Sequence, residues 1–217
     1  GCRLHIVHVS CGRGVALVAE ARAQGVDVTC ETCPHYLFLT DEDMIRLGAV
    51  AKCAPPLRAR AEQDELWRRL RDVTTIGSDH SPSPWSLKEA KNFLQAWGGI
   101  SGCQHLLPLL IDATDKISRA EIARLTSIGV ADRFRISEKG GLAIGKDADL
   151  TLVDSGAAEI VRTETLRYRH RHTPYAGRKL RGRIVRTILR GQTIFEDGKI
   201  GARPAGRLVR PGMPRAL

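Results

Sequence analysis

Two residues whose side chains can bind a metal ion stand where predicted β-strands end. His8 lies at the carboxyl end of the β-branched run 4–9, and Asp79 follows the run 73–77. In a closed barrel of alternating strands and helices, reactive side chains project from the carboxyl ends of the strands. Because imidazole nitrogen and carboxylate oxygen are ligands of zinc and similar cations, His8 and Asp79 could share a metal.

Each of these residues also has an ordinary structural interpretation. A histidine at the end of a strand is often a hydrogen-bonded packing residue, and an aspartate after Gly77 and Ser78 is often a turn or cap residue. Residue type and position by themselves leave both interpretations open.

The elements that would position these residues alternate between strand and helix. Strands are predicted at 4–9, 26–32 and 73–77, and helices at 15–24, 41–47 and 62–71, with an extended segment at 50–53. A loop at 81–99 and helices at 101–113 and 118–130 follow. This order predicts an α/β fold of right-handed parallel βαβ units.

The pattern changes after residue 138, where short strands replace helices. Strands are predicted at 149–154, 161–167, 182–189 and 193–195, with a glycine hairpin at 190–192. We therefore predict three parts, namely a partial barrel over 1–138, a small β-rich domain over 139–200 and a basic C-terminal tail over 201–217.

The formal net charge of the 217 residues is +10, and 26 of the 34 basic residues are arginine. This bias is typical of an arginine-rich composition rather than of a nucleic-acid tail, which usually mixes lysine and arginine, although a basic nucleic-acid module stays an alternative. No apolar run approaches the roughly 20 residues that a membrane helix needs. We therefore expect neither a nucleic-acid nor a membrane partner.

The six cysteines are irregularly spaced, which favours reduced thiols and a cytoplasmic protein. Cys30 and Cys33 form a Cys-x-x-Cys pair, but a structural zinc site would need a second pair at a suitable spacing. We interpret these two residues as packed thiols at the end of a strand.

Several longer motifs, in order along residues 4 to about 200, resemble the cyclic amidohydrolases: allantoinases, hydantoinases, dihydropyrimidinases and dihydroorotases. The motifs occupy residues 8–10, 31–36, 52–58, 78–82, 96–102, 145–149 and 187–191. Cys33-Pro34-His35-Tyr36 and Trp97-Gly98-Gly99-Ile100 are most similar to the allantoinase branch. The resemblance implies the C-terminal portion of a TIM (β/α)8 barrel of the amidohydrolase type, with a small β-sandwich accessory domain over 139–200.

The resemblance also implies a centre of two divalent metal ions, with zinc the expected metal. In the family a His-x-His pair, a bridging carboxylated lysine, two further histidines and an aspartate hold the two ions. His8 matches the histidine on the sixth barrel strand and Asp79 the aspartate on the eighth. The carboxylated lysine and the other histidines have no counterpart in this sequence.

Further site residues follow from the same motifs. Asp79 is the expected catalytic proton shuttle as well as a metal ligand. The expected substrate-binding residues, of which Ala54 lacks the hydroxyl that relatives offer, are Cys53, Ala54, His80, Ile100 and Ser101. His35 is expected to contact the site residues themselves and not the metal or the substrate.

The implied reaction is hydrolysis of a cyclic amide C–N bond in a cyclic ureide, with allantoin to allantoate as the first expectation. Alternatives are another cyclic amidohydrolase activity and a non-catalytic, dihydropyrimidinase-like interaction protein. A whole barrel usually needs about 250 residues, and about 130 are available here. We therefore expect a missing N-terminal half of the barrel, a homo-oligomer when that half is present, and no activity of this fragment by itself.

Overall fold

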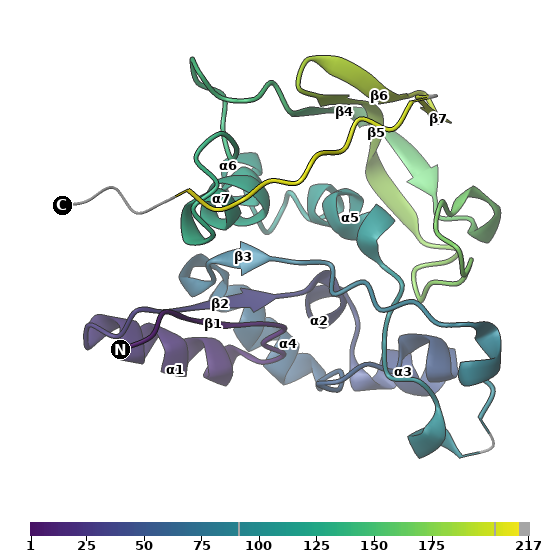
Figure 1. Ribbon diagram of the computed structural model, residues 1–217. Coiled ribbons are helices and arrows are strands. Elements are labelled where there is room, and N and C mark those ends of the chain that lie inside the picture. Colours follow the sequence, from purple (N-terminus) through teal and green to yellow (C-terminus); the bar gives the residue numbers. More distant parts are fainter. Residues whose placement is uncertain (91, 202, 213–217) are drawn as a thin grey trace. The chain divides into compact units, whose positions relative to one another are not determined.

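The computed structural model describes residues 1–90, 92–201 and 203–212 (Figure 1). Contacts between Cα atoms divide the chain into two compact units. The first unit contains Gly1–Leu109 and Ile160–Lys179, and the second contains Leu110–Glu159 and the residues from 180 onward. This division differs from the predicted limits at 138 and 200, and those domain limits stay a prediction.

The first unit is built on a parallel sheet of three short strands in the order β1-β2-β3. The strands are β1 (Leu4–Ile6), β2 (Val28–Thr32) and β3 (Thr75–Ile76). The helices between them are α1 (Gly12–Ala23), α2 (Pro34–Phe38), α3 (Asp41–Leu47) and α4 (Arg60–Arg68), with the 3-10 turns η1 (Gly48–Ala51) and η2 (Leu70–Asp72). The predicted βαβ alternation is confirmed, although each strand is shorter than predicted.

Local sequence signals explain where the helices around this sheet begin. Pro34 occupies the first turn of α2, where a missing N–H costs no hydrogen bond. Thr40 caps α3 by accepting a hydrogen bond from the N–H of Asp43, whose carboxylate accepts one from the N–H of Thr40 in return. The α3 helix has the predicted limits because the two residues of this reciprocal cap are only three positions apart in the sequence.

The α1 and α4 helices pack closely through a glycine. A Cβ atom on Gly12 would lie 2.2 Å from Cγ of Glu65 and 2.7 Å from its carbonyl carbon. On the same α4 helix, the indole of Trp67 donates a hydrogen bond to the carbonyl oxygen of Leu37, and the amide of Gln63 donates one to that of Leu39. These contacts fix α1 and the α2 region against α4.

Two predicted extended segments are wrong. Residues 50–53 lie partly in η1 and not in a strand, and the N–H of Lys52 donates to the carbonyl of Ala49. Residues 161–167 contain the 3-10 turn η7 (Thr163–Thr165). Before this turn, the N–H of Val161 donates to the carbonyl of Arg178, and the carbonyl of Val161 accepts from the N–H of Gly177. Neither segment has a neighbouring strand along its length, so local turns satisfy the backbone groups instead.

The loop after β3 and the helices beyond it are more broken than predicted. The loop contains the 3-10 turns η3 (Trp85–Leu87) and η4 (Phe93–Gln95) and leads into η5 (Cys103–His105) and α5 (Leu106–Asp112). The predicted helix at 118–130 consists of α6 (Arg119–Ala123), the π-helical turn η6 (Arg124–Ile128) and α7 (Gly129–Arg133).

The second unit carries a four-stranded sheet in the order β4-β5-β6-β7. Its strands are β4 (Leu150–Ile160), β5 (Lys179–Leu189), β6 (Gln192–Glu196) and β7 (Lys199–Ile200). The predicted hairpin is confirmed, since β5 and β6 are antiparallel and joined by Arg190 and Gly191, both with positive φ. A second hairpin at Asp197 and Gly198 was not predicted, although Asp-Gly is a strong signal for this turn.

Part of the predicted tail is tied to the second unit. Arg207 forms ion pairs with Glu138 and Asp147, and the N–H of Gly212 donates to the carbonyl of Arg135. Residues 202 and 213–217 of that tail lie outside the described residues. None of the helices in the described part of the chain is long and apolar enough to cross a membrane.

The glycine contact between α1 and α4 gives a stability prediction. Gly12→Ala should destabilise the chain by about 1–3 kcal/mol, because the new methyl group overlaps the backbone of Glu65 and the helices must move apart. Thermal unfolding followed by circular dichroism measures the change. Gly141→Ala is the matched control, since a Cβ atom there meets nothing within 4 Å. Equal midpoints for the two variants would show that α1 and α4 do not need this close approach.

Candidate metal and substrate site

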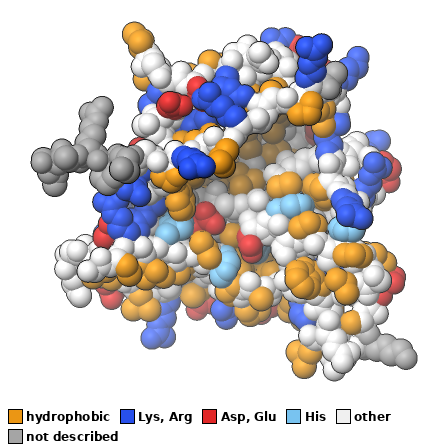
Figure 2. Space-filling model, in the orientation of Figure 1, with side chains coloured by type: hydrophobic (Ala, Val, Ile, Leu, Met, Phe, Trp, Pro, Cys, Tyr) orange, Lys and Arg blue, Asp and Glu red, His pale blue; other side chains and the backbone are white. Residues whose placement is uncertain are grey.

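The carboxyl ends of the three parallel strands lie at one edge of the first unit's sheet. The backbone pairing continues just past the strands, with the N–H of Val9 donating to the carbonyl of Glu31 at 2.8 Å and that of Gly77 to Thr32 at 3.1 Å. His8 immediately precedes Val9, and Asp79 lies two residues after Gly77. Figure 2 shows histidine and acidic side chains gathered over this sheet.

His8 and Asp79 share an unusual backbone conformation. Their φ angles are +45° and +43°, in the left-handed region that side chains other than glycine adopt uncommonly. Such a conformation typically costs about 1–3 kcal/mol and persists only where the surrounding structure enforces it. The two residues that the sequence singles out are therefore both held in a strained turn at the end of a strand.

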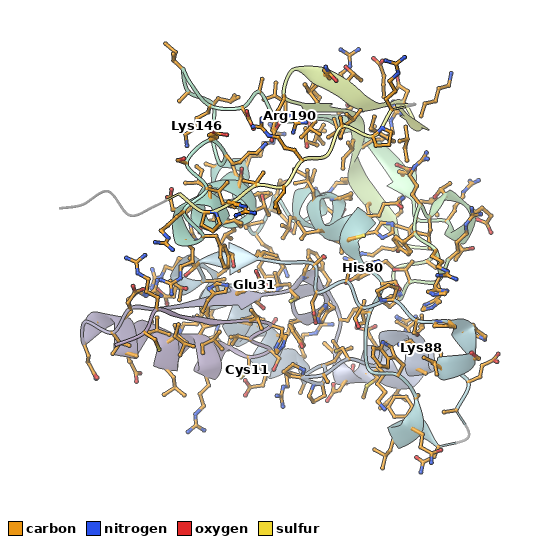
Figure 3. All side chains as sticks on the ribbon, in the orientation of Figure 1. Cys11, Glu31, His80, Lys88, Lys146 and Arg190 are labelled. Carbon is orange, nitrogen blue, oxygen red and sulfur yellow. The ribbon has the colours of Figure 1, made fainter. Side chains whose placement is uncertain are left out.

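A third charged residue at this edge, Glu31, was not predicted as a site residue. Its carboxylate accepts a hydrogen bond from the Thr75 hydroxyl at 3.0 Å and lies 4.0 Å from Nε2 of His5 (Figure 3). Burial raises the pKa of Glu31, nearby Asp79 also raises it, and nearby His8 lowers it. Both predicted ligands thus lie close enough to act on one carboxylate.

The sequence feature that could have identified Glu31 as a site residue is its place within a strand. An acidic residue in a β2 strand that alternates between buried and partly buried side chains must point to one face, and here that face also carries His5 and Thr75. Gly77 leaves room for it, since a Cβ atom at Gly77 would lie 2.4 Å from the Glu31 carboxylate. The glycine before Ser78 and Asp79 therefore serves the packing of Glu31.

His35 lies behind Asp79 together with Cys33. One donor atom from each of Cys33, His35 and Asp79 lies within 4.8 Å of the others. The Nε2 atom of His35 is buried without a hydrogen-bond partner among the described residues, and burial lowers the pKa of His35 to about 3, with His8 adding to the shift. His35 is therefore a neutral imidazole that belongs to this cluster and has one unpartnered ring nitrogen.

The donor set at the strand ends fits a divalent transition-metal ion. Neutral imidazoles and a carboxylate are suitable ligands for zinc, and an unpartnered buried imidazole nitrogen is costly without a ligand or a bound water. Cys33 and His35 are almost fully buried, whereas His8 and Asp79 are only partly buried. His8 and Asp79 can therefore offer ligands on the side where a substrate could enter.

The predicted substrate-binding residues Cys53 and Ala54 lie on a segment fixed by Tyr36. The Tyr36 hydroxyl donates a hydrogen bond to the carbonyl oxygen of Pro55 at 2.8 Å. Cys53 is buried and burial raises its pKa to about 12, while Ala54 is exposed. Ala54 thus presents its backbone and a methyl group to solvent, and Cys53 serves as packing.

His80, Ile100 and Ser101 are brought together by backbone pairing. His80 and Ile100 form a parallel bridge, and the N–H of Ser81 donates to the carbonyl of Ile100 at 3.0 Å. Nδ1 of His80 accepts a hydrogen bond from the N–H of Gly102 at 3.1 Å, and burial lowers the pKa of His80. His80 can therefore present Nε2–H as a donor.

The Ser101 carbonyl is held from a distant part of the chain. It accepts hydrogen bonds from the Thr173 hydroxyl at 2.8 Å and the Tyr168 hydroxyl at 3.4 Å. The ring of Tyr168 also packs 4.8 Å from that of His80. Ile100 and Ser101 are each 1% exposed, so both residues are almost fully buried in this structure.

A metal-binding experiment can show which residues ligate the ion, the pair His8 and Asp79 or the cluster of Cys33, His35 and Asp79. We expect His8→Ala to weaken cobalt binding by at least about tenfold and Cys33→Ser to leave it unchanged, because the buried thiol has no open coordination position toward solvent. Equilibrium dialysis measures affinity, and the visible spectrum of bound cobalt reports sulfur ligation. A thiolate band that disappears in Cys33→Ser would place the ion in the Cys33–His35–Asp79 cluster instead.

Comparison with known proteins identifies relatives of this chain. A model of the amidohydrolase family matches residues 15–195. The allantoinase of Rubrobacter xylanophilus is 56% identical over 97% of this chain and 48% of its own length, and that of Solibacter usitatus is 48% identical over 97% and 47%. The solved L-hydantoinase (dihydropyrimidinase) from Arthrobacter aurescens superposes with a TM-score of 0.90 and 33% identity, over 93% of this chain and 47% of that protein.

These matches confirm the predicted family and fold class. The chain spans about half the length of the curated relatives it matches. Its βα units and its accessory β-sheet are those of the amidohydrolase barrel with a β-sandwich. On the family match over residues 15–195, the chain belongs to the amidohydrolase family.

Proposed function

We propose that this chain forms part of a metal-dependent hydrolase that opens a cyclic amide, with allantoin as the substrate and allantoate as the product. The observation that supports the proposal is that His8 and Asp79, in motifs that match the family, follow the carboxyl ends of β1 and β3, the two strands that flank β2, and share the same left-handed backbone conformation. The 56% identity to an allantoinase supports allantoin over other rings.

The proposed cofactor is a pair of divalent ions, with zinc as the metal. His8 would ligate one ion through an imidazole nitrogen, and Asp79 would ligate through a carboxylate oxygen. Two donors cannot hold two ions, so the remaining ligands must come from outside these 217 residues, as the family pattern implies. When bound, the metal centre lowers the pKa of a water molecule and polarises the amide carbonyl.

Asp79 is the proposed proton shuttle. Its carboxylate accepts a proton from the water molecule whose oxygen forms a bond to the amide carbon. As the C–N bond breaks, Asp79 returns that proton to the leaving nitrogen, so the reaction needs no other proton donor. Glu31 is held by a hydrogen bond from the Thr75 hydroxyl, and nearby Asp79 adds to burial in raising the pKa of the Glu31 carboxyl.

Backbone groups are proposed to orient the ring. The exposed Ala54 can offer its backbone groups to a planar ureide, and the segment at Ile100 and Ser101, whose carbonyls already accept hydrogen bonds, can offer N–H groups. His80 can donate one hydrogen bond from Nε2. Backbone recognition of this kind suits a small ring with several amide groups.

Two further properties are proposals about the whole protein. Hydantoin and dihydropyrimidine rings are the next substrates to test, because a solved L-hydantoinase (dihydropyrimidinase) superposes closely on this chain. A homo-oligomer in the cytoplasm is the proposed state, in keeping with six free cysteines. Assays of allantoin, hydantoin and dihydrouracil with the metal-loaded full-length protein test the ring preference, and no hydrolysis of any ring would refute the proposed function.

Asp79→Asn in the full-length protein should remove most of the turnover and leave the fold intact. The amide is nearly isosteric with the carboxylate, but it cannot accept the proton, and loss of a general base typically costs about 10² to 10⁴-fold. The measurement is kcat against added zinc or manganese. Near-normal kcat at full metal occupancy would show that Asp79 is not the shuttle.

His8→Ala provides the matched comparison. It should lose activity through metal occupancy first, so added metal should partly restore kcat. The same additions should leave Asp79→Asn slow, because its defect is chemical. If added metal rescues both variants equally, the separation into ligand and shuttle is wrong.

The 217-residue chain assayed by itself should show no hydrolysis of allantoin. It supplies two of the six ligands that the family pattern implies, and an incomplete site does not exclude water. The measurement is release of the ureido product by the purified chain with zinc or manganese supplied. Product above the metal-only blank would contradict this expectation.

A further inference from the structure

Lys88 is a buried cation surrounded by main-chain oxygens. Its side chain is 4% exposed, and Nζ donates hydrogen bonds to the carbonyl oxygens of Ala49 at 3.0 Å, Trp97 at 3.0 Å and Gly99 at 2.6 Å. An ammonium group has three donors and no acceptor, so all of its hydrogen-bonding capacity is used. Figure 3 shows Lys88 in the loop that follows β3.

No carboxylate forms an ion pair with Lys88 in the part of the chain that the structure describes. Burial lowers the pKa of Lys88 to about 8, nearby Cys53 raises it, and nearby Lys52 lowers it. A lysine buried without a counter-ion is expensive unless its hydrogen bonds compensate. The three carbonyls supply that compensation, so Lys88 and these backbone segments depend on one another.

The three carbonyls belong to two segments that carry predicted substrate-binding residues. Ala49 lies in η1, which leads to Cys53 and Ala54, while Trp97 and Gly99 lead directly to Ile100 and Ser101. One ammonium group therefore bridges the two segments.

The two segments also touch each other beside this bridge. A Cβ atom on Gly98 would lie 3.8 Å from the Cys53 carbonyl carbon and 3.9 Å from the Ala54 methyl group. A Cβ atom on Gly99 would lie 2.4 Å from the Ser81 hydroxyl oxygen, so this glycine permits the close pairing of Ile100 with His80. Small displacements of residues 97–99 would therefore pass directly to the backbone at Ile100.

Lys52 makes a similar set of contacts farther along the same loop. Its Nζ donates to the carbonyl oxygens of Phe93 at 2.7 Å, Leu94 at 3.0 Å and Ala96 at 2.7 Å. These carbonyls precede the segment that meets Ser81 and Ile100, and Lys52 is more exposed than Lys88. Lys52 adjoins Cys53, but the carbonyls that it binds lie at 93–96 and not at the residues that lead directly to Ile100, so it is a control with the same chemistry and different carbonyl partners.

We propose that Lys88 is a positioning residue that sets the separation of the Cys53–Ala54 and Ile100–Ser101 backbones, and thereby the binding of the ring substrate. This inference rests on the proposed function for its substrate. The bridge that Lys88 forms between Ala49 and the pair Trp97 and Gly99, called the clamp below, does not depend on which substrate binds. Among the described residues, Lys88 forms no hydrogen bond to Asp79 or His8, so the chemical step should depend on it much less than binding does.

The test uses the full-length, metal-loaded protein. Lys88→Met keeps the length of the side chain and removes the charge and the donors. We expect it to raise KM for allantoin by about tenfold or more and to change kcat by less than about threefold. Lys88→Arg, which keeps the charge and the hydrogen-bond donors, should raise KM less than Lys88→Met does. Lys52→Met should change KM by less than about threefold. A fall in kcat with unchanged KM, or equal effects of Lys88→Met and Lys52→Met, would overturn the proposal.

Hydrogen–deuterium exchange separates the clamp from the proposed function. Without substrate, Lys88→Met should speed exchange in peptides covering 48–54 and 97–102, and leave those covering α1 and β2 unchanged. Unchanged exchange in both loop segments would refute the clamp even if KM rises. Loss of protection throughout the chain would show that Lys88 is a general stability residue, which also overturns the proposal. If no ring is hydrolysed but the local change is seen, the substrate assignment fails and the clamp stands.

Discussion

The parallel pairing of β2 with both of its neighbours is the constraint on which the candidate site depends. Parallel strands end at the same edge, and the ladder here runs past the strands to Val9 and Gly77. His8, just before Val9, and Asp79, two residues after Gly77, therefore lie at the same edge of the sheet although they are 71 positions apart in the sequence. A slip of the register by one residue would turn alternate side chains to the other face and move Glu31 away from this edge.

The structure sustains several unfavourable local features at this edge. His8 and Asp79 adopt positive φ angles, Glu31 is partly buried, and a buried nitrogen of His35 has no partner within the described ranges. Each of these costs free energy in a chain with no ligand, and together they lie within one small region. Features of this kind cluster at functional sites because the fold stabilises them elsewhere and a ligand compensates them locally.

Lysine side chains organise the loop beyond β3 by binding carbonyls rather than carboxylates. A loop without regular structure leaves main-chain oxygens unpaired, and an ammonium group can satisfy three of them at once. Lys52 binds three carbonyls of this loop and Lys88 binds two, together with that of Ala49 in η1, in a chain that otherwise favours arginine. The planar guanidinium group suits a carboxylate, whereas a compact ammonium group fits three converging carbonyls.

The sequence by itself determined the family, the βαβ order and elements with strong local signals, such as the limits of α3 and the hairpin at Arg190 and Gly191. These features depend on residues near one another in the chain, or on motifs that keep their order. Only the tertiary structure decided that residues 50–53 and 161–167 are not strands, because pairing needs a neighbouring strand. It also decided the roles of Glu31 and Lys88, since each of these side chains forms hydrogen bonds with residues that are far away in the sequence.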